Sequence, residues 1–433
     1  MTFKSMLLSA VSLILSSCFV YAQNLSLNNA VNKAIENNFQ VKILSNQVEI
    51  AELSNTYGNA GGLPLISGNV NQNFTLNNIQ QELSSGVTIN QKNATGNSFN
   101  SNLNAGILVF NGFKVRASKA KFEELVKQNK LILEDEILEL KANVNAAYYK
   151  VLEAQELQNQ YTKNLNLATR KKDLIQARIN AGYANEADLL QVQIEWNNLK
   201  TIIDLQNTNI ATAKKELLLV MAEHPSKVYE LTDTLAHHSL PAYSDLEAKL
   251  NSTSLLNIAE SSILIQRKIQ KEIEASKYPA IRLNGSYNFN RIQNSAGFNL
   301  VNQNYGPAIG LSMNIPIYNG GVLKNQSKIA ALQYENLELQ KHLLYTQLLS
   351  QLATEMERHD NLLRQCDEQN LTLEKASRLI EIMLTKFQLN QSTILDLNLA
   401  QQTYENAVLQ SIQLNYAAKM SEIKIRRLAD LPL

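Results

Sequence analysis

Glycine and proline are scarce in this sequence of 433 residues, which contains 15 and 7 of them respectively. Because these residues form turns and end helices, a chain with so few is expected to have long regular elements. Residues 113–180 contain neither, so a single helix over this range would reach on the order of 100 Å at ~1.5 Å per residue.

Long apolar runs and an excess of charge are also missing. No stretch after the N-terminus has the ~20 apolar residues of a membrane-spanning helix, so strands would have to do any spanning. Lysine and arginine total 40, against 39 acidic residues, and removal of Lys4 makes the counts equal. A neutral chain does not attract nucleic acid, and no nucleic-acid partner is expected.

Catalytic and metal-binding patterns are absent as well. The five histidines include the pair His237 and His238, which have no cysteine or carboxylates at metal-ligand spacing. No phosphate-binding loop, dinucleotide fingerprint or nucleophile elbow occurs. We therefore expect no metal, no cofactor and no enzymatic activity; an export-linked hydrolase lacks a catalytic constellation here.

The N-terminus has the pattern of an export signal. Lys4 precedes an apolar core from Met6 to Leu15, and Val20-Tyr21-Ala22 offers a cleavage site, which predicts a signal peptide at residues 1–22. Alternatively, Cys18 is the lipidated residue of a lipoprotein signal that ends before it. If Cys18 is removed, Cys366 is the only thiol and no internal disulfide can form.

Two strand pairs are predicted, at about 65–110 and 281–318, because apolar residues alternate there with asparagine and serine. This period of two fits a wall between lipid and water, and it fits a half-buried soluble sheet equally well. We expect residues 77–98 and 293–304 to be solvent-exposed loops. One face of the strands carries Ile66, Val70, Phe74, Leu103, Ile107, Val109, Ile281, Leu283, Tyr287, Ile309, Leu311, Met313, Ile315 and Ile317.

Long helical hairpins are predicted at about 113–222 and 322–430. A seven-residue apolar repeat predicts coiled-coil packing of the first helix. Turns near Gly182 and Asn390 suit residue types that tolerate a left-handed backbone. The stripe consists of Val126, Leu133, Leu140, Ala147, Ala154, Tyr161, Ala168 and Ile175, and a companion stripe of Ile137, Val144, Val151, Leu165 and Ile179.

The same plan occurs twice, which predicts a tandem internal repeat. Phe110-Asn111-Gly112 returns as Tyr318-Asn319-Gly320, 208 positions later, and the pair Gly182 and Asp188 returns at the same offset as Asn390 and Asp396. We expect a first repeat at 23–222, a connector at 223–245 and a second repeat at 246–433.

These landmarks resemble the TolC family of outer-membrane factors over essentially the whole mature chain. The resemblance rests on the opening Leu25-Ser26-Leu27-Asn28-Asn29-Ala30, on Leu63-Pro64 and Tyr278-Pro279, and on the two strand exits and two turns above. It implies an α+β membrane protein in the Gram-negative outer membrane. Three chains would share a 12-stranded transmembrane β-barrel, four strands each, continuous with a periplasmic coiled-coil barrel of α-helices.

The function that the resemblance implies is that of an exit duct in a tripartite efflux or type I secretion system. Its partners would be two further copies of the chain, outer-membrane lipid, a periplasmic adaptor protein and an inner-membrane transporter. The alternative is a soluble periplasmic coiled-coil scaffold without transport activity. The cargo is not specified by the sequence.

The resemblance also implies which residues act at the tips of the hairpins. The adaptor would dock on Gly182, Tyr183, Ala184, Asn185, Asn390, Gln391, Ser392 and Thr393. Asp188 and Asp396 would form acidic gate or cap positions, although a carboxylate early in a helix is also favoured by the helix dipole alone. Asn390 replaces the family's usual glycine, and Leu399 stands where some members have a second acidic residue.

Overall fold

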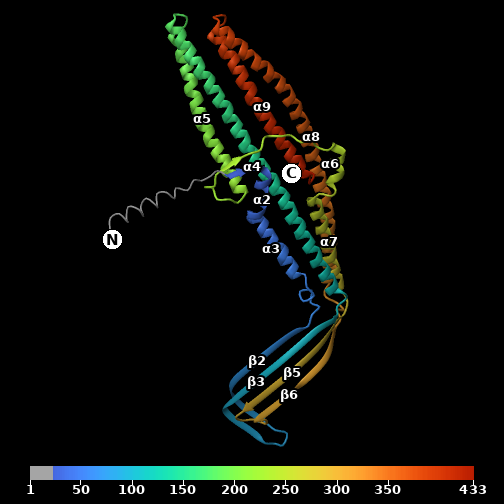
Figure 1. Ribbon diagram of the computed structural model, residues 1–433. Helices are drawn as coiled ribbons and strands as arrows, with labels where there is room; N and C mark the ends of the chain where they lie inside the picture. The colour runs from blue at the N-terminus through green and yellow to red at the C-terminus, as the bar shows by residue number, and fades with distance from the viewer. Residues whose placement is uncertain (1–22) are drawn as a thin grey trace, which may run out of the picture. The chain divides into compact units, whose positions relative to one another are not determined.

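The structure, a computed structural model, describes residues 23–433, so the predicted signal peptide and Cys18 lie outside the described residues. The described chain forms two compact units (Figure 1). Residues 46–132 and 257–343 form the sheet unit, and residues 23–45, 133–256 and 344–433 form the helical unit. Each unit thus takes segments from both halves of the sequence.

Four antiparallel strands form the main sheet of the sheet unit, in the order β2-β3-β5-β6. They span Leu65–Glu82 (β2), Thr88–Phe110 (β3), Ala280–Asn294 (β5) and Val301–Asn314 (β6). The two strand pairs of the sequence prediction are therefore present, and β3 and β5 join them. In the described chain, β2 and β6 are edge strands, each with one side unpaired.

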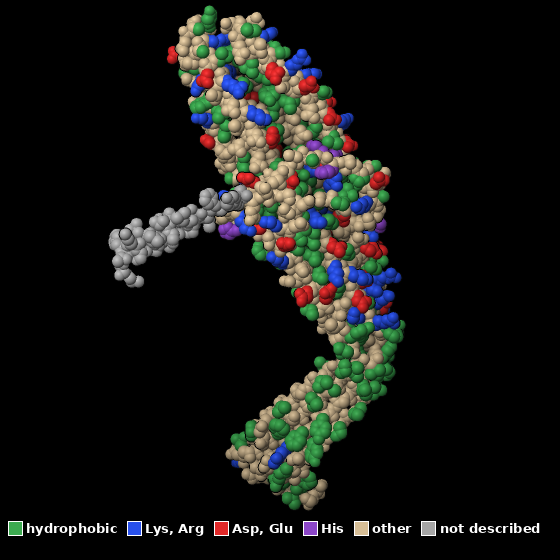
Figure 2. Space-filling view, viewed as in Figure 1, with side chains coloured by type: hydrophobic (Ala, Val, Ile, Leu, Met, Phe, Trp, Pro, Cys, Tyr) green, Lys and Arg blue, Asp and Glu red, His purple; other side chains and the backbone are tan. Residues whose placement is uncertain are grey.

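The strand register places residues of one kind on one face of this sheet. One row across the four strands contains Val70, Ser101, Phe289 and Tyr305, which face the same way because each is directly paired with the next. The adjacent row consists of asparagine alone: Asn71, Asn100, Asn290 and Asn304. Val70 and Tyr305 of the first row are exposed while Phe289 is half-buried, and Figure 2 shows apolar side chains gathered over the sheet.

The predicted loops at 77–98 and 293–304 were mostly wrong, because the strands continue through them. Only residues 83–87 and 295–300 lie between paired strands, and β6 ends at Asn314 rather than near 318. The polar residues of these segments still alternate in direction and pair across the sheet, as Asn77 does with Ala94. Apolar alternation does not detect strands whose both faces are polar.

Helices of the sheet unit are joined by ion pairs and amide contacts. They are the end of α3 (Phe39–Ser54), most of α7 (Ser254–Ala275) and the first parts of α4 (Lys114–Asn180) and α8 (Val322–Gln388). Lys121 Nζ lies 2.9 Å from Glu272 Oε2, Lys341 Nζ lies 2.7 Å from Glu260 Oε2, and Lys130 Nζ lies 2.7 Å from Glu52 Oε1.

Two helical hairpins dominate the helical unit: the remainder of α4 with α5 (Glu186–Val220), and the remainder of α8 with α9 (Ile394–Leu428). Helices α4 and α8 both have 67 residues, and α5 and α9 both have 35. Each helix of the second hairpin starts 208 positions after its counterpart.

The heptad prediction for α4 was right for the first stripe and partly wrong for its companion. Leu140, Ala154, Ala168 and Ile175 of the first stripe are buried. Val144 and Val151 of the companion stripe are buried too, but beyond them Asn164 is buried where the stripe predicts Leu165, and Lys171 is buried seven residues later. The companion stripe therefore shifts by one residue, and the buried face of α4 is polar at Asn164 and Lys171 before it becomes apolar again at Ile175.

Short elements flank the hairpins. β1 (Gln23–Leu25) pairs in parallel with β4 (Tyr229–Leu231), and α2 (Leu27–Asn37) and α6 (Tyr243–Leu250) complete the helical unit. Tyr148 Oη lies within hydrogen-bond distance of two acceptors, 2.8 Å from Leu25 O and 2.9 Å from Asp233 Oδ2, and so connects β1 to the segment that follows β4. Within residues 23–433, no helix combines the length and the apolar composition needed to cross a bilayer.

Gly112 and Gly320 occupy equivalent places before α4 and α8, and both have φ +65°. A Cβ at Gly112 would lie 2.6 Å from Ala275 O and 2.7 Å from Tyr278 Cβ, whereas a Cβ at Gly320 would have no atom within 4 Å.

We predict that Gly320→Ala lowers the free energy of unfolding by about 1 kcal/mol and Gly112→Ala by about 3 kcal/mol, because only Gly112→Ala adds a clash to the backbone strain. Thermal unfolding followed by circular dichroism checks this; equal effects would contradict it.

Candidate functional site at the helix tips

The two hairpin turns have the same backbone hydrogen-bond pattern. Gly182 N donates to Ile179 O at 2.9 Å and Tyr183 N to Arg178 O at 2.8 Å; Asn390 N donates to Phe387 O at 3.1 Å and Gln391 N to Lys386 O at 2.8 Å. This is the Schellman motif, which needs a left-handed residue at its centre. Gly182 has φ +79° and Asn390 has φ +60°, so asparagine takes the position of glycine.

Each returning helix begins with a capping box. Asn185 Oδ1 accepts from Asp188 N at 2.9 Å, while Asp188 Oδ2 accepts from Asn185 N at 3.3 Å. Thr393 Oγ1 accepts from Asp396 N at 3.2 Å, while Asp396 Oδ2 accepts from Thr393 N at 3.0 Å. Both aspartates therefore satisfy free amides at a helix N-terminus, where a carboxylate also meets the positive end of the dipole.

The carboxylate of Asp396 is held in its charged form by its own cap. Thr393 Oγ1 donates to Asp396 Oδ2 at 2.7 Å, and this bond, followed by the bond from the Thr393 amide, lowers the pKa of Asp396. Because the folded pKa is lowered, the contribution of the charged cap is complete above the ordinary aspartate pKa. It is lost as the pH falls through the lowered value.

Arg178 joins the first tip to the second within one chain. Its Nη2 donates to Phe387 O at 2.8 Å and to the side-chain oxygen of Asn390, and its guanidinium lies 4.0 Å from the centroid of the Phe387 ring. Phe387 is buried in an apolar cluster that also contains Ile175 and Leu397. A residue of α4 thus caps the carbonyl end of α8, which is where a cation is favoured.

A buried cation lies two turns before Arg178 on α4. Lys171 Nζ, with its side chain 1% exposed, lies 2.5 Å from Glu195 Oε2 of α5, 2.9 Å from Asn398 Oδ1 and 2.8 Å from Gln401 Oε1 of α9. Three partners compensate for the loss of water around the ammonium group. Glu405, which accepts from Gln401 Nε2 at 2.8 Å, has its pKa raised by burial and then by Glu195.

The structure brings the predicted site residues together in two turns and leaves most of them exposed. Tyr183 is 73% exposed, whereas Ala184 packs against the apolar cluster at the tips. Sequence reasoning missed Arg178, Phe387 and Lys171. The predicted heptad gave no signal for Lys171, because this residue becomes buried only where the companion stripe shifts by one position. In residues 23–433, no group of three histidine, cysteine, aspartate or glutamate side chains is placed to hold a metal.

Solved structures with this arrangement of strands and hairpins are outer-membrane channels. The CmeC outer membrane channel of Campylobacter jejuni is 16% identical, with a TM-score of 0.77 over 93% of this chain and 85% of that chain. VceC of Vibrio cholerae is 15% identical, with a TM-score of 0.76 over 93% and 95%. The open state of the MtrE channel of Neisseria gonorrhoeae is 16% identical, with a TM-score of 0.74 over 94% and 89%. At these identities the likeness establishes the fold.

The sequence itself establishes the family. Residues 30–222 and 266–429 match the profile described as outer membrane efflux protein, so the chain belongs to the outer membrane efflux protein family. This agrees with the TolC-type resemblance drawn from the turns and strand exits, and it places the protein in the outer membrane. A comparison with curated protein sequences found no match.

Loss of the Thr393 hydroxyl should fray α9 at its start. We predict that Thr393→Ala increases hydrogen exchange of the amides at 394–397 by about fivefold, the effect typical of losing an N-cap. In the unaltered protein, the protection of these amides against exchange should fall when the pH drops through the lowered pKa of Asp396. Thr403→Ala is the control, because within residues 23–433 its hydroxyl donates only to Leu399 O, at 2.8 Å, inside α9. Equal exchange in both variants would contradict the capping role.

Proposed function

We propose that the protein is a passive exit duct of the outer membrane, a homotrimer that a periplasmic adaptor docks on and an inner-membrane transporter drives. The system would be tripartite efflux or type I secretion. The observation that carries this proposal is the sheet of the sheet unit, which has an exposed apolar face, an asparagine-rich opposite face and two unpaired edges.

A closed barrel removes both free edges. When β6 of one chain pairs with β2 of the next, three chains of four strands give 12 strands, and no backbone group is left without a partner in the bilayer. The apolar row with Val70 and Phe289 would then face lipid, and the asparagine row with Asn71 and Asn290 would face water. A soluble scaffold would leave the apolar face in water.

The tandem repeat is part of this proposal. Equal helix lengths, a constant offset of 208 positions and two matched family ranges support repeats at 23–222 and 246–433 around a connector at 223–245. A duplication would give each chain two similar hairpins, so three chains would present six tips to a partner.

The tips are the proposed docking surface. Exposed apolar side chains gather beside both turns, including Tyr183 and Leu389 in the turns and Leu190 and Leu395 on the returning helices. The remaining docking residues (Gly182, Ala184, Asn185, Asn390, Gln391, Ser392 and Thr393) set the shape of this surface. Asp188 and Asp396 serve it as caps, and the contact of Arg178 with Phe387 and Asn390 would hold the tips in the closed arrangement.

Opposite faces of β2 offer a matched test of the membrane-spanning sheet. We predict that Val70→Lys destabilises the assembled protein by about 2 kcal/mol, because it puts a charge on the lipid face, and that Asn71→Lys is tolerated on the water-filled side. Membrane fractionation and the yield of SDS-resistant trimer are the measurements. A soluble monomer in the unaltered protein, or equal loss in both variants, would refute the membrane-spanning sheet.

Proline at the turn centres tests docking. We predict that Gly182→Pro and Asn390→Pro abolish export while trimers still form, because proline fixes φ near −65° where these turns need +79° and +60°. Asn390→Gly is the control, since glycine adopts the same backbone conformation without strain. The measurements are trimer yield and export of a transported compound. Unchanged export in the proline variants would remove the docking role.

A further inference from the structure

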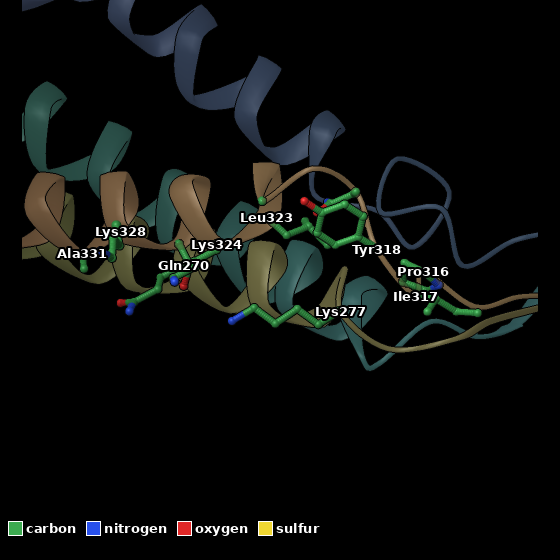
Figure 3. A pocket seen from close by; sticks show the side chains of 12 residues that line it. Gln270, Lys277, Pro316, Ile317, Tyr318, Leu323, Lys324, Lys328 and Ala331 are labelled. Atoms are coloured by element: carbon green, nitrogen blue, oxygen red, sulfur yellow. The ribbon is translucent and has the colours of Figure 1, made fainter.

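A groove with a basic and an apolar wall lies in the sheet unit, where the chain passes from β6 into α8. Its volume is about 620 Å³. Figure 3 shows its lining: Lys277 comes from the segment after α7, Lys324 and Lys328 come from the first turns of α8, and Ile317 and Tyr318 come from the segment between β6 and α8. The groove thus combines three cations with exposed apolar surface.

The three lysines of the groove have no carboxylate partner in the described part of the chain. This distinguishes them from Lys121 and Lys341 of the same unit, whose ammonium groups lie 2.9 Å from Glu272 and 2.7 Å from Glu260. Three unpaired ammonium groups around one groove repel each other, and an anion bound between them relieves that repulsion.

The apolar wall continues the apolar face of the sheet. Ile317 is 92% exposed and Tyr318 is 87% exposed, and both follow Leu311 and Met313 of β6, which are exposed on that face. Tyrosine next to an apolar band is typical of the membrane–water interface, where its ring is buried and its hydroxyl stays hydrated. A ligand that matches the groove therefore needs an anionic group attached to apolar chains.

A second groove has the same layout at the equivalent place before α4. There Phe110 corresponds to Tyr318 and Arg116 to Lys324, again 208 positions apart, and Lys268 and Lys271 of α7 supply further cations. This groove also contains Glu274, which offsets part of its charge. An aromatic residue and a cation thus recur at both strand-to-helix junctions, which points to a shared role. The attraction for an anion should be stronger at the groove with Lys277, Lys324 and Lys328, because no carboxylate lines it.

The β2 edge of a second copy would not supply the missing anion. In the proposed trimer, β6 pairs with β2 of the neighbour. The sequence from residue 53 to residue 81, which includes most of β2 and the segment before it, contains no charged residue at all. Covering that edge would therefore bring no carboxylate to the lysines from this segment.

We propose that this groove binds the phosphate group of an anionic phospholipid of the outer membrane, with the acyl chains against Ile317 and Tyr318. This inference rests on the proposed membrane-spanning sheet. Lysine side chains reach from an apolar surface to the headgroup level, and basic pockets at that level bind anionic headgroups. The bound lipid would belong to the leaflet next to the helices, because the groove lies at the helical end of the strands.

The test compares lipid binding by purified trimers. Trimers stripped of lipid are incubated with phosphatidylglycerol or with phosphatidylcholine of the same acyl chains, and bound lipid is counted by native mass spectrometry. We expect phosphatidylglycerol to be preferred, and the triple variant Lys277→Gln, Lys324→Gln, Lys328→Gln to bind it on the order of 100-fold more weakly. Replacement of the same three lysines by arginine should preserve binding.

Lys341→Gln is the matched control, because Lys341 is paired with Glu260 and lies roughly 20 Å further along α8. It should bind like the unaltered protein. Equal binding of the two lipids, unchanged binding by the triple variant, or displacement of the lipid by millimolar inorganic phosphate would overturn the proposal. Loss of the trimer in the triple glutamine variant alone would also overturn it and identify a subunit contact. Failure of the proposed duct appears separately, as unaltered protein that does not fractionate with membranes.

Discussion

Backbone hydrogen bonding at the edges of the sheet is the constraint on which the rest of the molecule depends. A strand in a bilayer has no water to satisfy its amides, and each unsatisfied group costs several kcal/mol. β2 and β6 each leave one such row in the described chain, while the rows between them sort apolar residues from asparagine. In the proposed assembly, closure with further copies would satisfy both edges and would place the apolar face against lipid and the asparagine face against water, as the alternation of residues requires.

Buried polar groups of the helical unit act on packing rather than on strand pairing, because they favour one arrangement of the helices over others. Apolar stripes pack in several registers at similar energy, whereas Lys171 is satisfied only where Glu195, Asn398 and Gln401 meet it. Glu422 acts similarly on α9, where it accepts from Lys419 at 3.0 Å and Arg426 at 2.9 Å and from the amide of His238 in the connector. Both clusters link segments far apart in the sequence.

Much of the fold could be predicted from the sequence, because its signals are local. The scarcity of glycine and proline indicated the long helices, Gly182 and Asn390 indicated the turns, and alternation indicated the strands. The strand ends beside the two loops were misplaced, because both faces are polar there and apolar residues then show no period of two. The contacts of Arg178 and Lys171 were missed because they join α4 to α8 and α9, and no local pattern encodes a partner more than 200 residues away.

The equal lengths of α4 and α8 limit how the protein can change during evolution. Both helices run 67 residues without interruption, and their ends meet through Arg178, Phe387 and Asn390. Deletion of one residue from α4 alone would rotate its tip by about 100° and draw it back by ~1.5 Å, which would separate these groups. A longer or shorter relative is therefore expected to change both helices together, in steps of about seven residues.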